Sequence, residues 1–161
     1  MCCRTRIDKH NYYLNIAQEV AARGTCLRRN YGAIIVKNDE IIATGYTGAP
    51  RGRKNCVDLQ RCRREELNVK SGERYDLSRS VHAEANCIIS ASRRDMIGST
   101  MYLAGLSMPG GELYEEAACC DMCKRLIINS GIENVIVRNT KEKYTVVSVE
   151  MWIAEDDSLN Y

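Results

Sequence analysis

Several features that define other classes of protein are missing from this sequence. It contains no run of about 18 apolar residues, so a transmembrane helix and a membrane partner are not expected. Its first residues lack the apolar core of a signal peptide. The formal net charge of +2 gives no reason to expect general binding to nucleic acid or to acidic surfaces. A length of 161 residues without repeats predicts a single domain over residues 1–161 with a sizeable core.

The even set of cysteines that a disulfide framework needs is also missing. The chain has nine cysteines, an odd number, and nothing else in the sequence indicates secretion. We therefore expect reduced thiols and metal ligands in a cytoplasmic protein.

Two short stretches carry the chemistry: residues 81–84, Val-His-Ala-Glu, and residues 120–123, Cys-Asp-Met-Cys. After each, apolar or small residues recur with the period of a helix that has one buried face. Cys120 and Cys123 would lie one turn apart on one face, so both sulfurs can reach a single ion. His82, at the start of the other helix, supplies a third ligand, and helix N-termini favour thiolates.

Three protein ligands are what a catalytic zinc requires, because the fourth tetrahedral position must stay open for water. Zinc lowers the pKa of that water towards ~7. Glu84 follows His82 too closely to be a good ligand beside it, so we expect it to move protons between the water, a ring nitrogen and a leaving amine. One histidine, two cysteines and a non-ligand glutamate make up the site of zinc nucleobase deaminases.

Each stretch alone has a simpler explanation. A Cys-x-x-Cys pair is often a redox pair or half of a structural zinc clip, and a single His-x-Glu carries little information. Both stretches occur here in order, and each opens an amphipathic helix after a strand. This combination favours a catalytic zinc.

The remaining pattern predicts an α/β fold. We expect a mixed sheet of about five strands flanked by helices, with the metal at one end of the sheet. The acidic tail, residues 151–161, carries the only tryptophan. The first helix is expected over residues 9–23, a hairpin over 33–36 and 41–44, metal-site helices over 82–93 and from 120, and strands over 100–106, 134–138 and 144–149.

A basic loop lies between the hairpin and the first metal-binding stretch. Six of the 14 residues from Arg51 to Arg64 are arginine or lysine, and a glycine-rich segment runs through residues 45–54. Such a loop is either a solvated surface segment or a phosphate site, since backbone amides and arginine side chains hold phosphate well.

The sequence resembles the deoxycytidylate (dCMP) deaminases of the cytidine deaminase superfamily over residues 9–138. The resemblance rests on residues 81–86, 45–52 and 123–132, and on the Gly-Glu-Arg-Tyr stretch of the bacterial branch at residues 72–75. It implies a three-layer cytidine deaminase-like fold and hydrolytic deamination of dCMP to dUMP and ammonia, which feeds thymidylate synthesis. It also implies a homo-oligomer, often a hexamer, and control by dCTP and dTTP.

The resemblance also implies roles for individual residues. His82, Cys120 and Cys123 take the zinc-ligand positions, and Glu84 takes the proton-transfer position. The implied substrate contacts are Ala83 through its N–H to the pyrimidine carbonyl, Thr47 to the sugar or base, and Arg28, Arg51 and Arg53 to the phosphate.

Three departures from the family bear on the substrate. Cys119, next to the ligands, stands where most relatives have proline, and it could compete for the metal. Thr47 replaces an asparagine that contacts the nucleotide. The segment 107–118, between the two metal-site helices, is longer than usual and resembles an inserted hairpin or lid.

A second, structural zinc is a further expectation from the bacterial relatives. Cys26, Cys56 and Cys62 match cysteines that help hold it, but the fourth ligand falls at about Ser78, and serine is a poor zinc ligand. The three cysteines are therefore either ordinary thiols or a weaker site completed by water or by a carboxylate such as Asp58.

Two other classes of function compete. One keeps the chemistry and changes the substrate to another cytosine nucleotide, a free base or a tRNA base. The basic residues cluster in one loop, whereas a polynucleotide favours a broad basic face. The other is a zinc-stabilised module without turnover, but a structural site has no use for Glu84 beside an open position.

Overall fold

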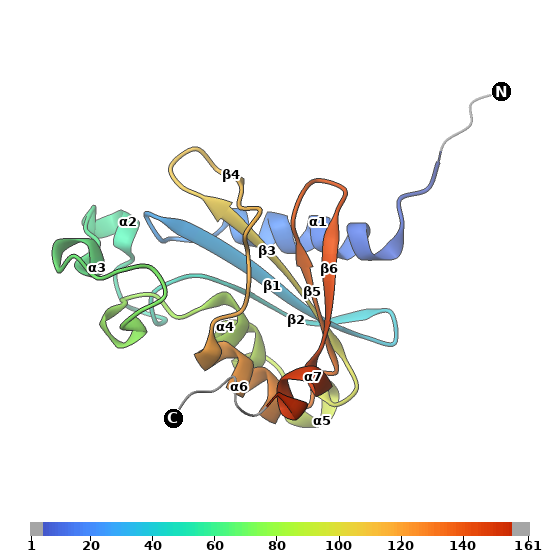
Figure 1. Ribbon diagram of the computed structural model, residues 1–161. Coiled ribbons are helices and arrows are strands. Elements are labelled where there is room, and N and C mark those ends of the chain that lie inside the picture. The colour runs from blue at the N-terminus through green and yellow to red at the C-terminus, as the bar shows by residue number, and fades with distance from the viewer. Residues whose placement is uncertain (1–4, 156–161) are drawn as a thin grey trace.

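The computed structural model describes residues 5–155, and the strands in this range form one six-stranded sheet (Figure 1). The order across the sheet is β2-β1-β3-β5-β6, and β4 pairs with β3. All pairs are antiparallel except β3 and β5, which are parallel. The strands are β1 (Arg29–Lys37), β2 (Glu40–Tyr46), β3 (Thr100–Ser107), β4 (Glu112–Leu113), β5 (Asn134–Arg138) and β6 (Tyr144–Ser148).

Helices cover both faces of the sheet, which gives three layers (Figure 1). Helix α1 packs on one face, and α4 and α6 pack on the other. None of the helices in residues 5–155 is long and apolar enough to cross a membrane. The helices are α1 (Lys9–Ala22), α2 (Cys56–Leu59), α3 (Arg63–Glu66), the 3-10 helix η1 (Tyr75–Leu77), α4 (Ala83–Ile89), α5 (Arg93–Met96), α6 (Asp121–Ser130) and α7 (Val149–Ala154).

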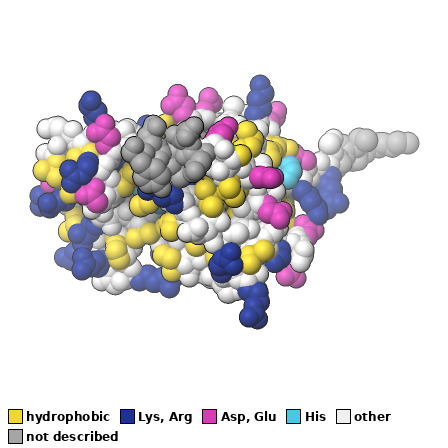
Figure 2. Space-filling model, turned by 60° about the horizontal axis from the view of Figure 1, so that its bottom comes forward, with side chains coloured by type: hydrophobic (Ala, Val, Ile, Leu, Met, Phe, Trp, Pro, Cys, Tyr) yellow, Lys and Arg dark blue, Asp and Glu magenta, His cyan; other side chains and the backbone are white. Residues whose placement is uncertain are grey.

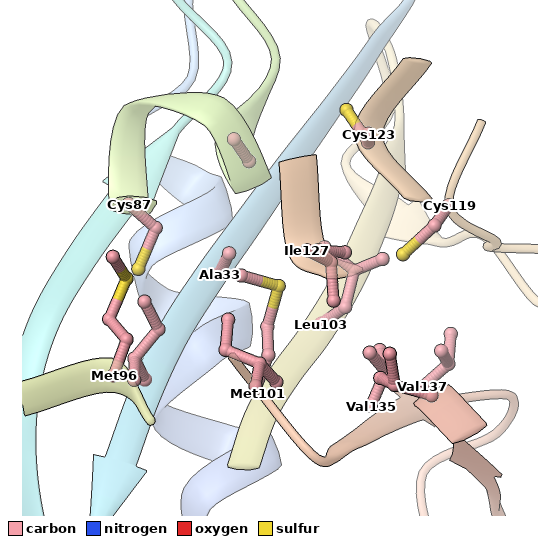
Figure 3. Close-up of a cluster of buried hydrophobic side chains, with 14 of the residues drawn as sticks. Ala33, Cys87, Met96, Met101, Leu103, Cys119, Cys123, Ile127, Val135 and Val137 are labelled. Carbon is pink, nitrogen blue, oxygen red and sulfur yellow. The ribbon is translucent and has the colours of Figure 1, made fainter. Parts of the chain in front are cut away.

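The alternation of side chains along β1 divides the core in two. Ile34 faces α1, and Ile35 faces the layer of α4 and α6, because neighbouring residues of a strand point to opposite faces. Figure 3 shows the second of these clusters, in which Met101 and Leu103 of β3 lie against Ile127 of α6. The metal-site helices are therefore fixed to the sheet by a continuous apolar contact.

Gly45 allows α4 to approach β2 at backbone distance. A Cβ atom at this position would collide with the backbone nitrogen of Cys87 and the backbone oxygen of Ala83. The absence of a side chain at Gly45 therefore sets how closely α4 packs on the sheet. Helix α4 begins directly after His82.

The predicted α/β fold with a mixed sheet and flanking helices is confirmed. The first helix, the hairpin and the strand at residues 134–138 are found where expected, and Asn38 and Asp39 of the hairpin turn have positive φ angles of 50° and 66°. This is the conformation that Asn and Asp adopt in tight hairpin turns.

The boundaries differ in several places. The sheet has six strands instead of about five, because the 107–118 segment adds β4. The helix after His82 ends at Ile89, and Ser92 caps the separate helix α5 by accepting a hydrogen bond from the N–H of Asp95. Ile89 is 74% exposed and does not belong to the buried face. The start of the acidic tail forms α7, and residues 156–161 lie outside the described range.

Candidate active site

Two helix starts meet at one end of the sheet. His82 is the N-cap residue of α4 and Cys120 is the N-cap residue of α6. Val81, just before α4, exchanges two backbone hydrogen bonds with Gly48 after β2, at 2.8 and 3.2 Å. This bridge anchors the chain that leads into α4 and so fixes the position of His82.

The three predicted ligands lie together. The Nδ1 atom of His82 is 3.5 Å from the sulfur of Cys120 and 3.4 Å from the sulfur of Cys123. Tetrahedral zinc, with bonds of about 2.0 Å to nitrogen and 2.3 Å to sulfur, sets these atoms roughly 3.5 Å apart. The residues present therefore fit zinc. Within residues 5–155, this is the one group of three or more His, Cys, Asp or Glu ligand atoms that all lie within 4.8 Å of one another.

The ligand side chains also favour a charged sulfur. The hydrogen bond from the Cys123 thiol, together with His82, lowers the pKa of Cys120 although its burial opposes this. Burial acts to lower the pKa of His82, but its hydrogen bond to Cys120 and the neighbouring Glu84 outweigh burial and raise it. A thiolate at Cys120 is the protonation state that zinc binding needs.

Glu84 lies in the first turn of α4 and is only 3% exposed. Its burial raises the pKa of the carboxyl group, against the opposing effects of its backbone N–H and of His82. A carboxyl group whose pKa is raised can hold a proton at a pH where an exposed glutamate cannot. Glu84 therefore has the environment of a group that both accepts and donates a proton.

Cys119 does not join the three ligands. Its side chain is buried in the hydrophobic cluster of Ile127 and Val137 (Figure 3). Burial, and then the nearby Glu84, raises the pKa of its thiol, so it stays protonated and is a poor competitor for the metal.

A cavity opens beside His82 and Glu84. Two walls of this cavity carry arginine: the start of β1 with the residue before it contributes two, and the loop before α4 contributes one. Besides the metal-site residues, its principal lining residues are Arg28, Arg29, Tyr31, Thr47, Arg64 and Tyr75.

Two of the expected phosphate contacts lie elsewhere. Arg51 is exposed and is not among the residues that line this cavity. Arg53 lines a separate surface pocket with Arg61, Arg63 and Arg79. Of the three arginines expected at the phosphate, only Arg28 reaches the cavity.

Thr47 lines the cavity, but its hydroxyl group is engaged with the backbone. Its oxygen accepts a hydrogen bond from the N–H of Tyr31 at 3.0 Å. Thr47 therefore joins the end of β2 to β1, and the structure gives it a role in shaping the cavity wall. Ala83 is the first residue of α4, so its N–H has no acceptor within the helix and remains free for a ligand.

Arg64 and Tyr75 line the cavity, and neither was expected as a site residue from the sequence. The ring of Tyr75 packs edge-on against His82, with ring centres 4.6 Å apart, and the guanidinium of Arg64 lies over Tyr75 at 4.9 Å. Arg64 also donates to the backbone oxygens of Lys70 and Glu73 at 2.8 and 2.7 Å. The Gly-Glu-Arg-Tyr stretch at residues 72–75 was the available signal for this wall.

The three cysteines expected at a second zinc do not form a comparable cluster among residues 5–155. Cys56 is buried, and its sulfur is 3.9 Å from the hydroxyl of Ser80. Cys26 lines the cavity, and Cys62 caps α3. Both Cys26 and Cys62 are near enough to Cys56 to raise the pKa of its thiol, after the larger effect of burial. The second zinc site therefore stays a prediction.

Known proteins share this sequence pattern and fold. A family model described as the cytidine and deoxycytidylate deaminase zinc-binding region matches residues 7–139. A deoxycytidylate deaminase of Mycobacterium phage D29 is 34% identical over 134 residues, which cover 82% of this chain and 95% of the phage protein. One from Schizosaccharomyces pombe is 30% identical over 133 residues, which cover 83% of this chain but only 38% of the yeast protein. The crystal structure of dCMP deaminase from cyanophage S-TIM5 in apo form matches with a TM-score of 0.58 at 23% identity, over 84% of this chain and 86% of that chain, and supports the fold.

Proposed function

Because this chain belongs to the family of zinc-binding cytidine and deoxycytidylate deaminases, we propose that it converts dCMP and water to dUMP and ammonia. The observation that carries the proposal is the buried carboxyl group of Glu84, which lines the same cavity as His82 and Cys120 of the three-ligand cluster. We choose dCMP as the substrate because the relatives are deoxycytidylate deaminases.

The residues of the cavity divide the reaction between them. His82, Cys120 and Cys123 would hold zinc, which when bound supplies an activated water at neutral pH. Glu84 accepts one proton from the attacking water and delivers it to N3 of the pyrimidine, and it then accepts the second proton of that oxygen and delivers it to the departing amine. Its raised pKa suits this exchange, because a group that both takes and gives protons works best with a pKa near the operating pH. The N–H of Ala83 donates to the pyrimidine carbonyl.

The cavity also supports a phosphorylated substrate. Arg28, Arg29 and Arg64 line it, so positive charge lies beside the reacting groups. Arg28 forms an ion pair with Glu65, in which Nε of Arg28 lies 3.3 Å from a carboxylate oxygen of Glu65. Arg29 and Arg64 have no ion pair within residues 5–155, so they are the stronger candidates for the 5′-phosphate.

We further propose one domain that acts as a homo-oligomer in the cytoplasm, with dCTP and dTTP as effectors. The seven cysteines in the described range are free thiols, which suits a reducing compartment. Figure 2 shows hydrophobic side chains among charged ones on the side covered by α4, α6 and α7, which supports contact with further copies. The exposed apolar residues on these helices are Ile89, Met122, Leu126, Met151 and Ile153.

The test is ammonia release from dCMP, cytidine and guanine, measured side by side on zinc-loaded protein. We expect dCMP to be the preferred substrate. Glu84→Gln should retain zinc and lose activity by at least ~10²-fold, the lower range for a general acid–base group. His82→Ala should lose zinc and activity together.

Glu19→Gln is the matched control, because Glu19 is an exposed carboxylate on α1. It should leave turnover unchanged. Near-normal turnover by Glu84→Gln would contradict the mechanism, and a preference for guanine or cytidine would contradict the substrate.

A further inference from the structure

The 107–118 segment folds back onto the end of β3 beside the cavity. The N–H of Tyr114 donates to the backbone oxygen of Gly105 at 2.8 Å, and Ala118 at the end of the segment lines the cavity. A Cβ atom at Gly105 would lie 3.2 Å from Tyr31 and 3.3 Å from Ala117, so a glycine there lets the segment and Tyr31 pack closely together. The segment is therefore part of the cavity wall.

The ring of Tyr114 contacts two cavity residues of β1. The guanidinium carbon of Arg29 lies 4.0 Å from its centre, and the ring of Tyr31 packs against it edge-on at 6.4 Å and 78°. Arg29 and Tyr31 are two positions apart on the strand, so their side chains share one face, and both line the cavity. Tyr114 thus contacts both cavity side chains from the 107–118 segment.

Stacking on Tyr114 leaves the charge of Arg29 usable. The guanidinium carbon lies over the ring at 4.0 Å, and a guanidinium that contacts a ring through its flat face keeps its in-plane N–H donors available to another ligand. Arg29 is half-buried and has no ion pair within the described residues. A guanidinium that is fixed by an aromatic ring and has no ion-pair partner can bind an anionic group of a ligand in the cavity.

We propose that Tyr114 is a positioning residue that holds Arg29 in the orientation that binds the 5′-phosphate, which makes the 107–118 segment a determinant of nucleotide specificity. The inference rests on the proposed function. Tyr114 touches no reacting atom and acts through Arg29. The ring does the positioning, since the hydroxyl of Tyr114 faces the exposed Glu116 at 3.2 Å.

The test measures the affinities of dCMP and deoxycytidine by calorimetry on zinc-loaded Glu84→Gln protein, which binds without turnover. Adding Tyr114→Ala should weaken dCMP binding roughly three- to tenfold, the cost of ordering one free side chain on binding. Deoxycytidine, without a phosphate, should bind unchanged. Arg29→Gln should weaken dCMP roughly ten- to hundredfold, the range for a charge-assisted hydrogen bond.

Three further variants separate positioning from general damage. Tyr114→Phe keeps the ring and should bind dCMP as the parent does, and so should Tyr12→Ala, which removes an exposed tyrosine on α1. The Arg29→Gln/Tyr114→Ala double variant should be no weaker than Arg29→Gln alone.

Additive losses in the double variant, or an equal loss for deoxycytidine after Tyr114→Ala, would overturn the inference. Both of these outcomes leave the proposed function intact as long as the wild-type protein releases ammonia from dCMP. Absence of that turnover would overturn the proposed function, and this inference with it.

Discussion

At the scale of single residues, the position of each arginine relative to the cavity decides which can bind phosphate. We predict that dCMP exceeds deoxycytidine in kcat/KM by at least ~10²-fold, because charge-assisted contacts contribute about 1.5–3 kcal/mol each and the cavity offers more than one. Arg64→Gln should remove much of this difference. Arg51→Gln is the matched control and should change it less than about twofold, because Arg51 is exposed and outside the cavity. Equal rates on the nucleotide and the nucleoside would refute the prediction.

The zinc cluster was predictable from the sequence because each part of it is local. The spacing of Cys120 and Cys123 places both on one helical turn, and the histidine two residues before Glu84 opens a second helix. The contact between Arg64 and Tyr75, and that between Arg29 and Tyr114, join residues at no fixed spacing. Such contacts follow from the folded path of the chain, so the sequence could not identify them.

At the scale of helices and strands, the close contact of α4 with β2 depends on Gly45. We predict that Gly45→Ala destabilises the protein by about 2–3 kcal/mol, at the upper end of the usual cost of overpacking, because the new Cβ meets backbone that cannot rotate away. It should also lower zinc affinity, since α4 begins at His82. Gly110→Ala is the control, because there the nearest atoms belong to the flexible side chain of Glu112. Denaturant unfolding and zinc titration check both, and an unchanged midpoint in Gly45→Ala would contradict the prediction.

The attachment of α1 to the hairpin gives a pH-dependent prediction. The hydrogen bond from Lys9, and then that from Tyr13, lowers the pKa of Asp39 below its ordinary value of 3.8. A group whose pKa falls on folding adds stability above its unfolded pKa and loses it as the pH drops through its folded pKa. Asp39→Asn should therefore lower the Tm at pH 7, and the difference should shrink as the pH falls below 3.8 and vanish once the pH is below the lowered pKa of Asp39. Glu40→Gln, at the neighbouring exposed position, should show no such pattern in thermal scans; a difference that persists in acid would refute the assignment.

Element types were predictable where one signal dominated. The strand at 134–138 contains the β-branched run 135–137 and has the predicted boundaries, whereas the apolar period after His82 continued past the true end of α4. Ser90 there donates to the backbone oxygen of Asn86, and Ser92 caps the next helix. Serines compete for backbone groups in this way, and a count of apolar positions cannot detect it.

At the scale of the whole molecule, zinc should stabilise the fold as well as take part in catalysis. It would join α4 to α6, and so link both helices that cover one face of the sheet. We predict that chelation lowers the Tm by on the order of 10 °C, because a ligand at a thousand times its Kd contributes about 4 kcal/mol and a domain of this size shifts by roughly 2–4 °C per kcal/mol. Cys123→Ala should not respond to chelator in the same scan. An unchanged Tm in fully chelated wild-type protein would contradict the prediction.

Zinc content separates the two alternatives for the remaining cysteines. The described residues gather one set of three ligands, so elemental analysis should give near one zinc per chain. A content near two zinc ions per chain, falling to one in Cys56→Ser, would support the second site predicted from the resemblance.

The layered arrangement of the fold was predictable, since strands and helices alternate along most of the chain. The paths of the loops that form the cavity walls were not predictable from periodicity, and the Gly-Glu-Arg-Tyr stretch at residues 72–75 was the one signal for any of them.

The loop before α4, the 107–118 segment and the zinc-ligand cluster come from different parts of the molecule. The cluster is held by α4 and α6 on the sheet, whereas the segments that carry Tyr75 and Tyr114 are connections added around that framework. Connections tolerate substitution and changes of length far better than packed helices do. A library that varies residues 70–74 and 107–116 and keeps Tyr75, which packs against His82, should therefore change the preference among modified pyrimidines while zinc binding is retained. Because the loops are separate from the helices that hold the ligands, substitutions in them can change the substrate while the catalytic residues stay in place.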